Sequence, residues 1–159
     1  MSSKVWEVHR NNLKKLKDNL KKCSFGNASY IVAAGLGDKS MASVTINEAG
    51  SSSSLLLESK TPSDGIEIKT LPQIISELSI NFNVIKMDIE GFERGAIGAS
   101  LDYINNHLPR LMLSVYHKPD DLWGIALDIY QVVGKRYKYY LRQEGHWGYE
   151  TILYCIPEN

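Results

Sequence analysis

The most constraining feature of the sequence is an apolar run at 84–89 that passes directly into carboxylates and then into a helical pattern. The acids Asp88 and Glu90 stand two positions apart, so an extended backbone places both side chains on one side. In open α/β sheets, ligands bind in the crevice outside the carboxyl ends of the strands. The sequence therefore predicts an α/β fold with a site at this strand end.

A second apolar run, at 111–116, repeats the arrangement and leads into Tyr116, His117 and Lys118. Its pattern indicates another strand, separated from the first by a helical segment. Parallel strands joined through a helix have their carboxyl ends at the same edge of the sheet. We therefore expect the two polar strand ends to form one pocket.

Length and charge narrow the classes of protein that the sequence can represent. A chain of 159 residues suits a single domain over 1–159, and its 18 basic and 18 acidic residues cancel. With no net charge, the protein has no overall electrostatic field that attracts nucleic acid. No apolar run approaches the roughly 18 residues of a membrane span. Cys23 and Cys155 are too few for a disulfide framework or a four-cysteine zinc site. We expect a cytoplasmic protein with a small-molecule partner and no nucleic-acid or membrane partner.

Periodicity predicts helices that alternate with strands and a hairpin at the end. The expected helices are 11–22, Leu71–Leu78, 91–106 and 119–134, and the expected strands are 27–34, 42–46, 66–68, 84–89 and 111–116. The stretch 50–54, with its serines, is expected to be a loop. The last two strands, 137–142 and 151–156, are joined by a segment too short for a crossover helix, so we expect them to be antiparallel.

The residues at the two strand ends suggest specific chemistry. A histidine titrates near neutral pH, which suits His117 to general base catalysis, although a histidine here can equally be a polar strand terminus that hydrogen-bonds nearby backbone. Close carboxylates such as Asp88 and Glu90 demand a cation between them or a raised pKa. The pair supplies too few oxygen ligands for a divalent metal, so we assign no metal.

Three further features have a structural explanation beside a functional one. Trp123 either lines an acceptor pocket or packs near the core, and Glu93 is best explained by the positive end of a helix dipole. The glycines at 35–38 are typical of a nucleotide-binding turn, but such a turn opens a helix. The β-branched residues that follow predict a strand, so we expect an ordinary turn and keep nucleotide binding at 35–39 as a rival hypothesis.

The motifs at both strand ends resemble the FkbM family of S-adenosylmethionine-dependent methyltransferases. The matching stretches are 85–93 with Gly98 and Ala99, 109–111, 114–123, then Tyr139, Leu141 and Arg142, and finally Glu150, Thr151, Leu153 and Tyr154. The resemblance implies a Rossmann-like class I methyltransferase sheet, mostly parallel with an antiparallel C-terminal hairpin. It also implies methyl transfer from S-adenosylmethionine to a hydroxyl of a sugar or secondary metabolite.

The resemblance assigns roles to individual residues. Glu7, in a segment similar to the family's second strand, would bind the cofactor ribose. Asp88 and Glu90 would bind the cofactor beneath the reactive centre, and Asp88 with His117 would be catalytic. The acceptor side would be formed by Tyr116, Lys118 and Trp123.

One family element has no counterpart in the sequence. The first strand and its glycine-rich turn, which pack against the methionine part of the cofactor, would lie before Met1. We therefore expect an N-terminally truncated domain whose sheet has unpaired edges, which favours self-association. The rival interpretation is a non-catalytic remnant that acts as an interaction module.

Overall fold

The computed structural model describes residues 3–6, 10–22, 29–32, 34–49, 52–58, 66–143, 145 and 150–158, whose strands form three hydrogen-bonded sheets. Backbone contacts divide the chain into two compact units. One unit is Met1–Leu36 with Ser40–Lys69, and the other is Gly37–Lys39 with Thr70–Asn159. The two polar strand ends predicted above both belong to the second unit.

A β-α-β segment opens the first unit. Strand β1 (Ser3–Trp6) and strand β2 (Ser29–Val32) pair in parallel, and helix α1 (Arg10–Lys22) lies between them in the chain. The side chains at Leu13, Leu16 and Leu20 are half-buried, whereas the lysines of α1 are exposed. The helix predicted at 11–22 is therefore confirmed, and it is amphipathic.

The other sheet of the first unit has the order β3-β6-β4-β5. Its members are β3 (Gly35–Leu36), β4 (Met41–Ala49), β5 (Ser52–Glu58) and β6 (Ile66–Lys69). The predicted loop at 50–54 is wrong for residues 52–54, because Ser52 pairs with Ala49 and Ser53 with Glu48 in an antiparallel ladder. Backbone pairing along this hairpin outweighs the weak strand preference of serine.

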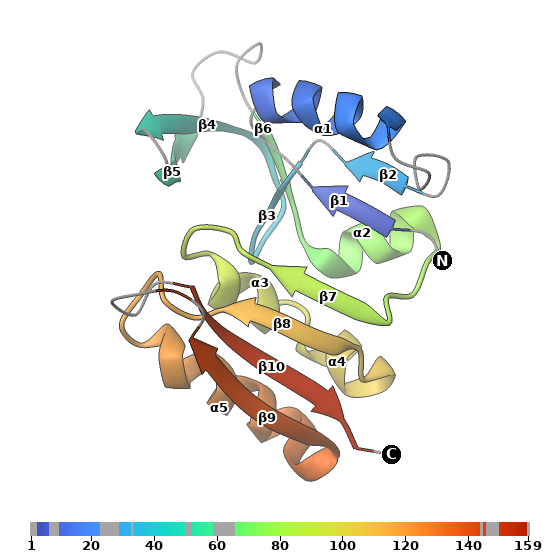
Figure 1. Ribbon diagram of the computed structural model, residues 1–159, viewed down its shortest axis with the longest axis vertical. Helices are drawn as coiled ribbons and strands as arrows, with labels where there is room; N and C mark the ends of the chain where they lie inside the picture. The colour runs from blue at the N-terminus through green and yellow to red at the C-terminus, as the bar shows by residue number, and fades with distance from the viewer. Residues whose placement is uncertain are drawn as a thin grey trace. The chain divides into compact units, whose positions relative to one another are not determined.

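The second unit contains a four-stranded sheet of order β7-β8-β10-β9, shown in Figure 1. Strands β7 (Val84–Met87) and β8 (Arg110–Ser114) are parallel, and β10 (Thr151–Pro157) is antiparallel to β8 and to β9 (Tyr137–Gln143). The expected antiparallel hairpin is confirmed. Strand β7 has β8 as its one neighbour among the described residues, so its other side forms an edge of this sheet.

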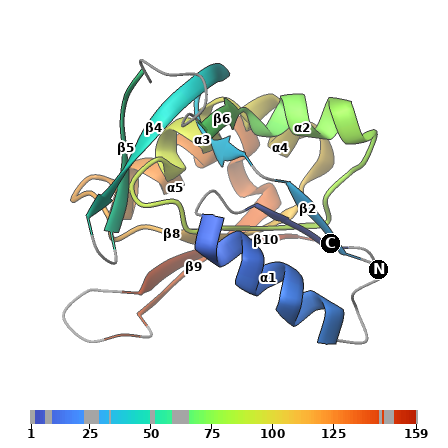
Figure 2. The same cartoon turned by 90° about the horizontal axis from the view of Figure 1, so that it is seen from above.

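Helices complete the second unit. They are α2 (Leu71–Leu78), α3 (Glu93–Gly98), α4 (Leu101–His107) and α5 (Asp121–Val133), followed by the 3-10 turn η2 (Gly134–Arg136). Helices α4 and α5 cover the same face of the sheet in Figures 1 and 2. The core between these layers is apolar and includes Ile97, Ile104, Leu111, Leu113, Ile125 and Ile129, all fully buried.

The predicted helix at 91–106 is two helices instead. Ser100 interrupts it, because its hydroxyl donates a 2.6 Å hydrogen bond to the carbonyl of Ala96 and its N–H bonds to the carbonyl of Ile97. A serine that bonds backbone groups in this way competes with the regular helical pattern. The break leaves α3 as a short helix that begins immediately after the strand-end acids.

Candidate active site

The two polar strand ends lie together at one edge of the sheet. Strands β7 and β8 run in parallel with Met87 opposite Leu113, so the backbone leaves both strands at the same edge of the sheet. Asp88 follows the first strand directly, and Tyr116 and His117 follow the second. The structure thus brings together residues that are 28 and more positions apart in the chain.

A tight turn follows β7. The N–H of Phe92 donates to the carbonyl of Ile89, while Glu90 and Gly91 have φ angles of 56° and 91°. Positive φ at both central positions is the pattern of a type I′ turn, and it is unfavourable for a glutamate. A Cβ on Gly91 would come within 3.2 Å of Lys118 Cε and 3.5 Å of His117 Cβ. The turn therefore packs directly against the segment that follows β8.

Glu93 is fully buried at the start of α3 and fixes this turn. Its Oε1 accepts a hydrogen bond of 2.6 Å from the N–H of Ile89, and its Oε2 accepts one of 2.9 Å from the N–H of Gly91. Hydrogen bonds to an ionised acceptor are stronger than neutral ones. Sequence analysis assigned Glu93 to the helix dipole alone and missed this role, because the sequence does not show that the side chain turns back toward its own strand.

The imidazole of His117 lies among three carboxylates. Its Nδ1 is 3.0 Å from Glu93 Oε1, and its Nε2 is 3.4 Å from Glu90 Oε2 and 3.6 Å from Asp88 Oδ1. The side chain is 10% exposed, and neither ring nitrogen has a partner in hydrogen-bonding geometry within the described part of the chain. A buried polar ring without aligned partners is unusual and typical of a functional site.

Tyr116 and Lys118 flank the imidazole. The Tyr116 ring lies 4.2 Å from the ring of His117, and its hydroxyl donates a long bond of 3.5 Å to Asp88 Oδ1. Burial and the charge of Asp88 raise the pKa of Tyr116, which keeps its hydroxyl protonated. The ammonium group of Lys118 lies 5.7 Å from the centre of the Phe92 ring.

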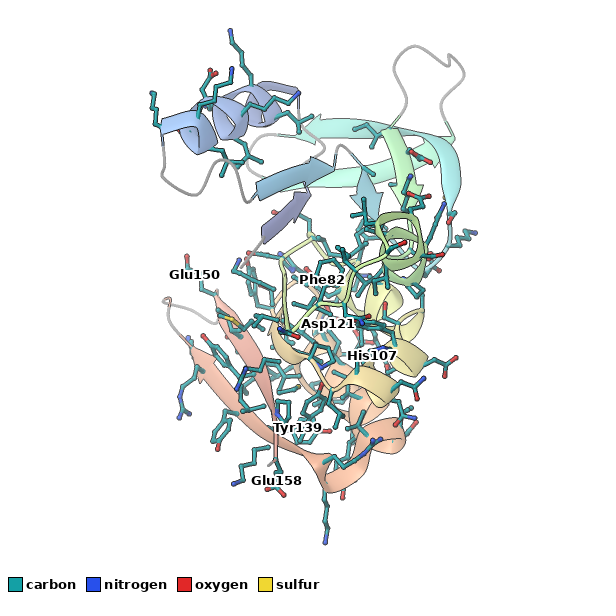
Figure 3. The ribbon with its side chains drawn as sticks, turned by 90° about the vertical axis from the view of Figure 1, so that its right-hand side faces the viewer. Phe82, His107, Asp121, Tyr139, Glu150 and Glu158 are labelled. Carbon is teal, nitrogen blue, oxygen red and sulfur yellow. The ribbon has the colours of Figure 1, made fainter. Side chains whose placement is uncertain are left out.

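Asp121 adds a further buried carboxylate near the same segment. It is 1% exposed and lies at the start of α5, labelled in Figure 3. Its Oδ2 accepts from the N–H of Lys118 at 3.2 Å, whereas Oδ1 is buried without a hydrogen bond. Burial raises the pKa of Asp121. Sequence analysis gave it no role, although an acid in the first turn of a helix is a recognisable start signal.

Other predicted residues lie elsewhere or are not described. Glu7 falls outside the described residues. Trp123 is 56% exposed on α5, so the near-core alternative does not hold for it. Gly35 and Leu36 form strand β3, and the next element is strand β4, as predicted for an ordinary turn rather than a nucleotide-binding one.

No helix in the described part of the chain is long and apolar enough to cross a membrane.

Comparison with known proteins identifies the fold. The chain is similar to the crystal structure of methyltransferase FkbM from Methylobacillus flagellatus KT, with a TM-score of 0.74 and 24% identity over 97% of this chain and 36% of that one. The chain thus spans about a third of that protein's length.

The α/β architecture, with parallel and antiparallel strand pairs and an antiparallel last strand, is the class I methyltransferase fold that the sequence predicted. No curated protein matches the sequence. The model of the methyltransferase FkbM domain matches residues 2–143. The chain therefore belongs to the FkbM methyltransferase domain family.

Proposed function

We propose that the chain forms part of an S-adenosylmethionine-dependent O-methyltransferase that acts on a hydroxyl of a sugar or secondary metabolite. The observation that carries this proposal is the position of His117 Nε2, which faces Asp88 and Glu90 where two parallel strands end. Ligands of open α/β sheets bind at such strand ends. Family membership supplies the reaction class.

The charges at the site fit a cationic methyl donor. When bound, S-adenosylmethionine supplies an electrophilic methyl group on a positively charged sulfur. The side chains of Asp88 and Glu90 are 41% and 43% exposed, and neither pairs with a lysine or arginine among the described residues. We assign both to the cofactor side, together with Glu7 for the ribose.

The acceptor side consists of groups that orient a hydroxyl and remove its proton. In the proposal, His117 Nε2 accepts the proton, and Asp88 stabilises the resulting imidazolium at 3.6 Å. Tyr116 and Lys118 contact the acceptor beside the imidazole, and Trp123 extends the contact along α5. Glu93 is a positioning residue, because it acts on the acceptor only through His117.

Titration calorimetry of the folded chain with S-adenosylmethionine tests the proposal. We expect submillimolar binding that weakens roughly tenfold in Asp88→Asn, because one charged contact is lost. Asp102→Asn removes an exposed acid from α4 and is the matched control, which should bind like the unchanged chain. No heat with a chain that circular dichroism shows to be folded would reject cofactor binding.

The role of His117 needs a separate measurement. Once an acceptor is known, His117→Ala should retain cofactor binding and lose turnover by about 10²–10⁴-fold, the usual contribution of a general base. Unchanged turnover would remove His117 from the mechanism and leave cofactor binding unaffected.

One observation favours a second candidate, a non-catalytic interaction module. Within the described residues, no glycine-rich turn joins a strand to a helix, since Gly35 lies in β3 and Gly37 lies between β3 and β4. The same titration decides between the candidates, because a module of this kind gives no heat with S-adenosylmethionine.

A further inference from the structure

We propose that His117 and its surrounding carboxylates form a binding site for a divalent transition-metal cation. In this site, His117 Nε2, Asp88 and Glu90 coordinate the cation, and Glu93 holds the opposite ring nitrogen. Sequence analysis assigned no metal because Asp88 and Glu90 alone supply too few ligands. The structure adds an imidazole and a buried carboxylate to that pair.

The spacing of the donor atoms suits coordination. Metal bonds of about 2.1 Å arranged as a tetrahedron place neighbouring donor atoms about 3.4 Å apart. The distances from His117 Nε2 are 3.4 Å to Glu90 Oε2 and 3.6 Å to Asp88 Oδ1. One ligand atom each from Asp88, Glu93 and His117 lie within 4.8 Å of one another, whereas Glu90 is not part of that group and approaches it only through its 3.4 Å contact with His117 Nε2. Since Asp88 and Glu90 are both partly exposed, small rotations bring their oxygens onto a common ion.

The buried imidazole is the second, independent observation. Its side chain is nine-tenths buried, and both ring nitrogens lack an aligned hydrogen bond in the described part of the chain. A cation at Nε2 satisfies that nitrogen. It also fixes the proton on Nδ1, the nitrogen that lies 3.0 Å from Glu93 Oε1. A carboxylate behind a metal-bound histidine is a common arrangement, and it orients the ring and strengthens its bond to the metal.

Glu93 is placed for this supporting role. Both of its oxygens already accept backbone N–H groups of the Ile89–Phe92 turn, so the carboxylate cannot rotate freely toward the ion. The same turn holds Glu90 at a φ of 56°, an unfavourable conformation that the surrounding structure must maintain. The turn therefore fixes one ligand directly and orients another through Glu93.

The charge balance also calls for a cation. Three carboxylates surround one imidazole, and none of them pairs with a lysine or arginine among the residues that the structure describes. Lys118, which follows His117 in the chain, places its ammonium over the ring of Phe92, and Arg94, which follows Glu93, pairs with Asp120 and Asp128. Mixed imidazole and carboxylate ligands suit ions such as Zn²⁺, Mn²⁺ and Co²⁺ better than Mg²⁺ or Ca²⁺, which prefer oxygen ligands.

The role of this cation rests on the proposed function, but its binding does not. A metal and a proton compete for Nε2, so His117 is a base only when the ion is absent. With the ion bound, the metal would act as a Lewis acid on a coordinated acceptor hydroxyl, whose proton would pass to water instead of to His117. Titration with metal alone needs neither methyl donor nor acceptor, so its failure leaves the methyltransferase proposal standing.

The test is a titration of chelator-treated protein with Co²⁺, followed by visible absorption and by displacement with Zn²⁺. We expect saturation at one equivalent, together with at least tenfold weaker binding in His117→Gln and in Asp88→Asn. Glu93→Gln should bind 10–100-fold more weakly, as expected for a supporting ligand. His107→Gln is the matched control, since that histidine lies on α4 with Nδ1 3.1 Å from the carbonyl of Tyr103, and it should bind normally.

Two outcomes would overturn the inference. One is a folded protein that shows no saturable Co²⁺ binding. The other is binding that persists unchanged in both His117→Gln and Asp88→Asn. Because Asp88 is exposed, its variant remains informative even if a change at buried Glu93 prevents folding, which circular dichroism would reveal.

Discussion

Glu93 Oε1 lies 3.0 Å from His117 Nδ1, a contact between the first residue of α3 and the segment that follows β8. Glu93 is fully buried and also accepts two backbone N–H groups, so one carboxylate connects the turn after β7 to the imidazole. The local stability of the unit and the position of the imidazole therefore depend on the same side chain.

Glu93→Gln keeps the shape of the side chain and removes its charge. We expect the free energy of unfolding to fall by about 1–3 kcal/mol, because one buried and one part-buried N–H group lose a carboxylate acceptor. Urea denaturation measures this loss. Asp102→Asn, an exposed acid in the first turn of α4, should change the free energy by less than about 0.5 kcal/mol. Equal losses in the two variants would contradict the role given to Glu93.

Gly91→Ala tests the turn itself. Gly91 has a φ of 91°, and a Cβ there would lie 3.2 Å from Lys118 Cε. We expect a loss of about 1–2 kcal/mol from the left-handed backbone, with some further loss from crowding. Gly98→Ala is the matched control, because a Cβ on that α3 residue meets no atom within 4 Å. It should be neutral or stabilise the helix by up to about 1 kcal/mol. In thermal unfolding, the Tm should therefore fall in Gly91→Ala and stay level or rise in Gly98→Ala.

Arg94 and Gly124 should be energetically coupled. The Arg94 guanidinium bonds Asp128 through Nε at 2.7 Å and Asp120 through Nη1 at 2.9 Å, and it lies over Gly124 of α5. A Cβ on Gly124 would approach Nη1 to 2.7 Å. We expect Gly124→Ala to give no stability gain in the unchanged chain, because it displaces the guanidinium.

In an Arg94→Ala background, the same Gly124→Ala change should be stabilising, since alanine favours a helix over glycine by about 1 kcal/mol. A double-mutant cycle from urea denaturation measures the coupling between the two positions. If the two changes in the free energy of unfolding are additive, the Arg94 guanidinium moves away from Gly124 without loss of stability.

Cys155 predicts how stability responds to alkaline pH. Complete burial raises the pKa of its thiol from 9.0 to about 12. The unfolded chain therefore releases this proton near pH 9, whereas the folded chain keeps it. The stabilisation is fully present below the unfolded pKa and is lost as the pH rises toward the folded one. We expect the free energy of unfolding to fall by about 1 kcal/mol between pH 8 and pH 10.

Cys155→Ala should flatten this part of the profile while lowering stability at every pH, because it leaves a small cavity. The tyrosines act at higher pH, since burial raises the pKa of Tyr137 and raises that of Tyr139 to about 12. A slope between pH 8 and pH 10 that is the same with and without Cys155 would show that another group is responsible.

The sequence predicted those parts of the fold that depend on local pattern. The limits of α2 were predicted to the residue, because Thr70 caps the helix and Pro72 lies in its first turn, where a missing N–H is tolerated. The hairpin of β9 and β10 followed from a connection too short for a helix. Parallel pairing of β7 and β8 followed from the helical segment between them.

Features that depend on tertiary contact were not predicted. The serines at 52–54 form a strand only because β4 lies beside them, and the break at Ser100 follows from one side-chain hydrogen bond. At the site, the sequence indicated Asp88 and His117 but not their contact with Glu93. That contact depends on the reversal of the chain at Glu90 and Gly91, where a glutamate adopts a backbone conformation that its own preference disfavours.

The strand order of the second unit has a consequence for synthesis of the chain. Among the four strands of this sheet, β10 is the last to leave the ribosome, yet it lies between β8 and β9. Until it emerges, β9 has no ladder to join, and the backbone groups of β8 on that side stay in water. Assembly of this sheet therefore has to wait until all four of its strands have been translated, and partly translated chains present an open β8 flank that chaperones can occupy.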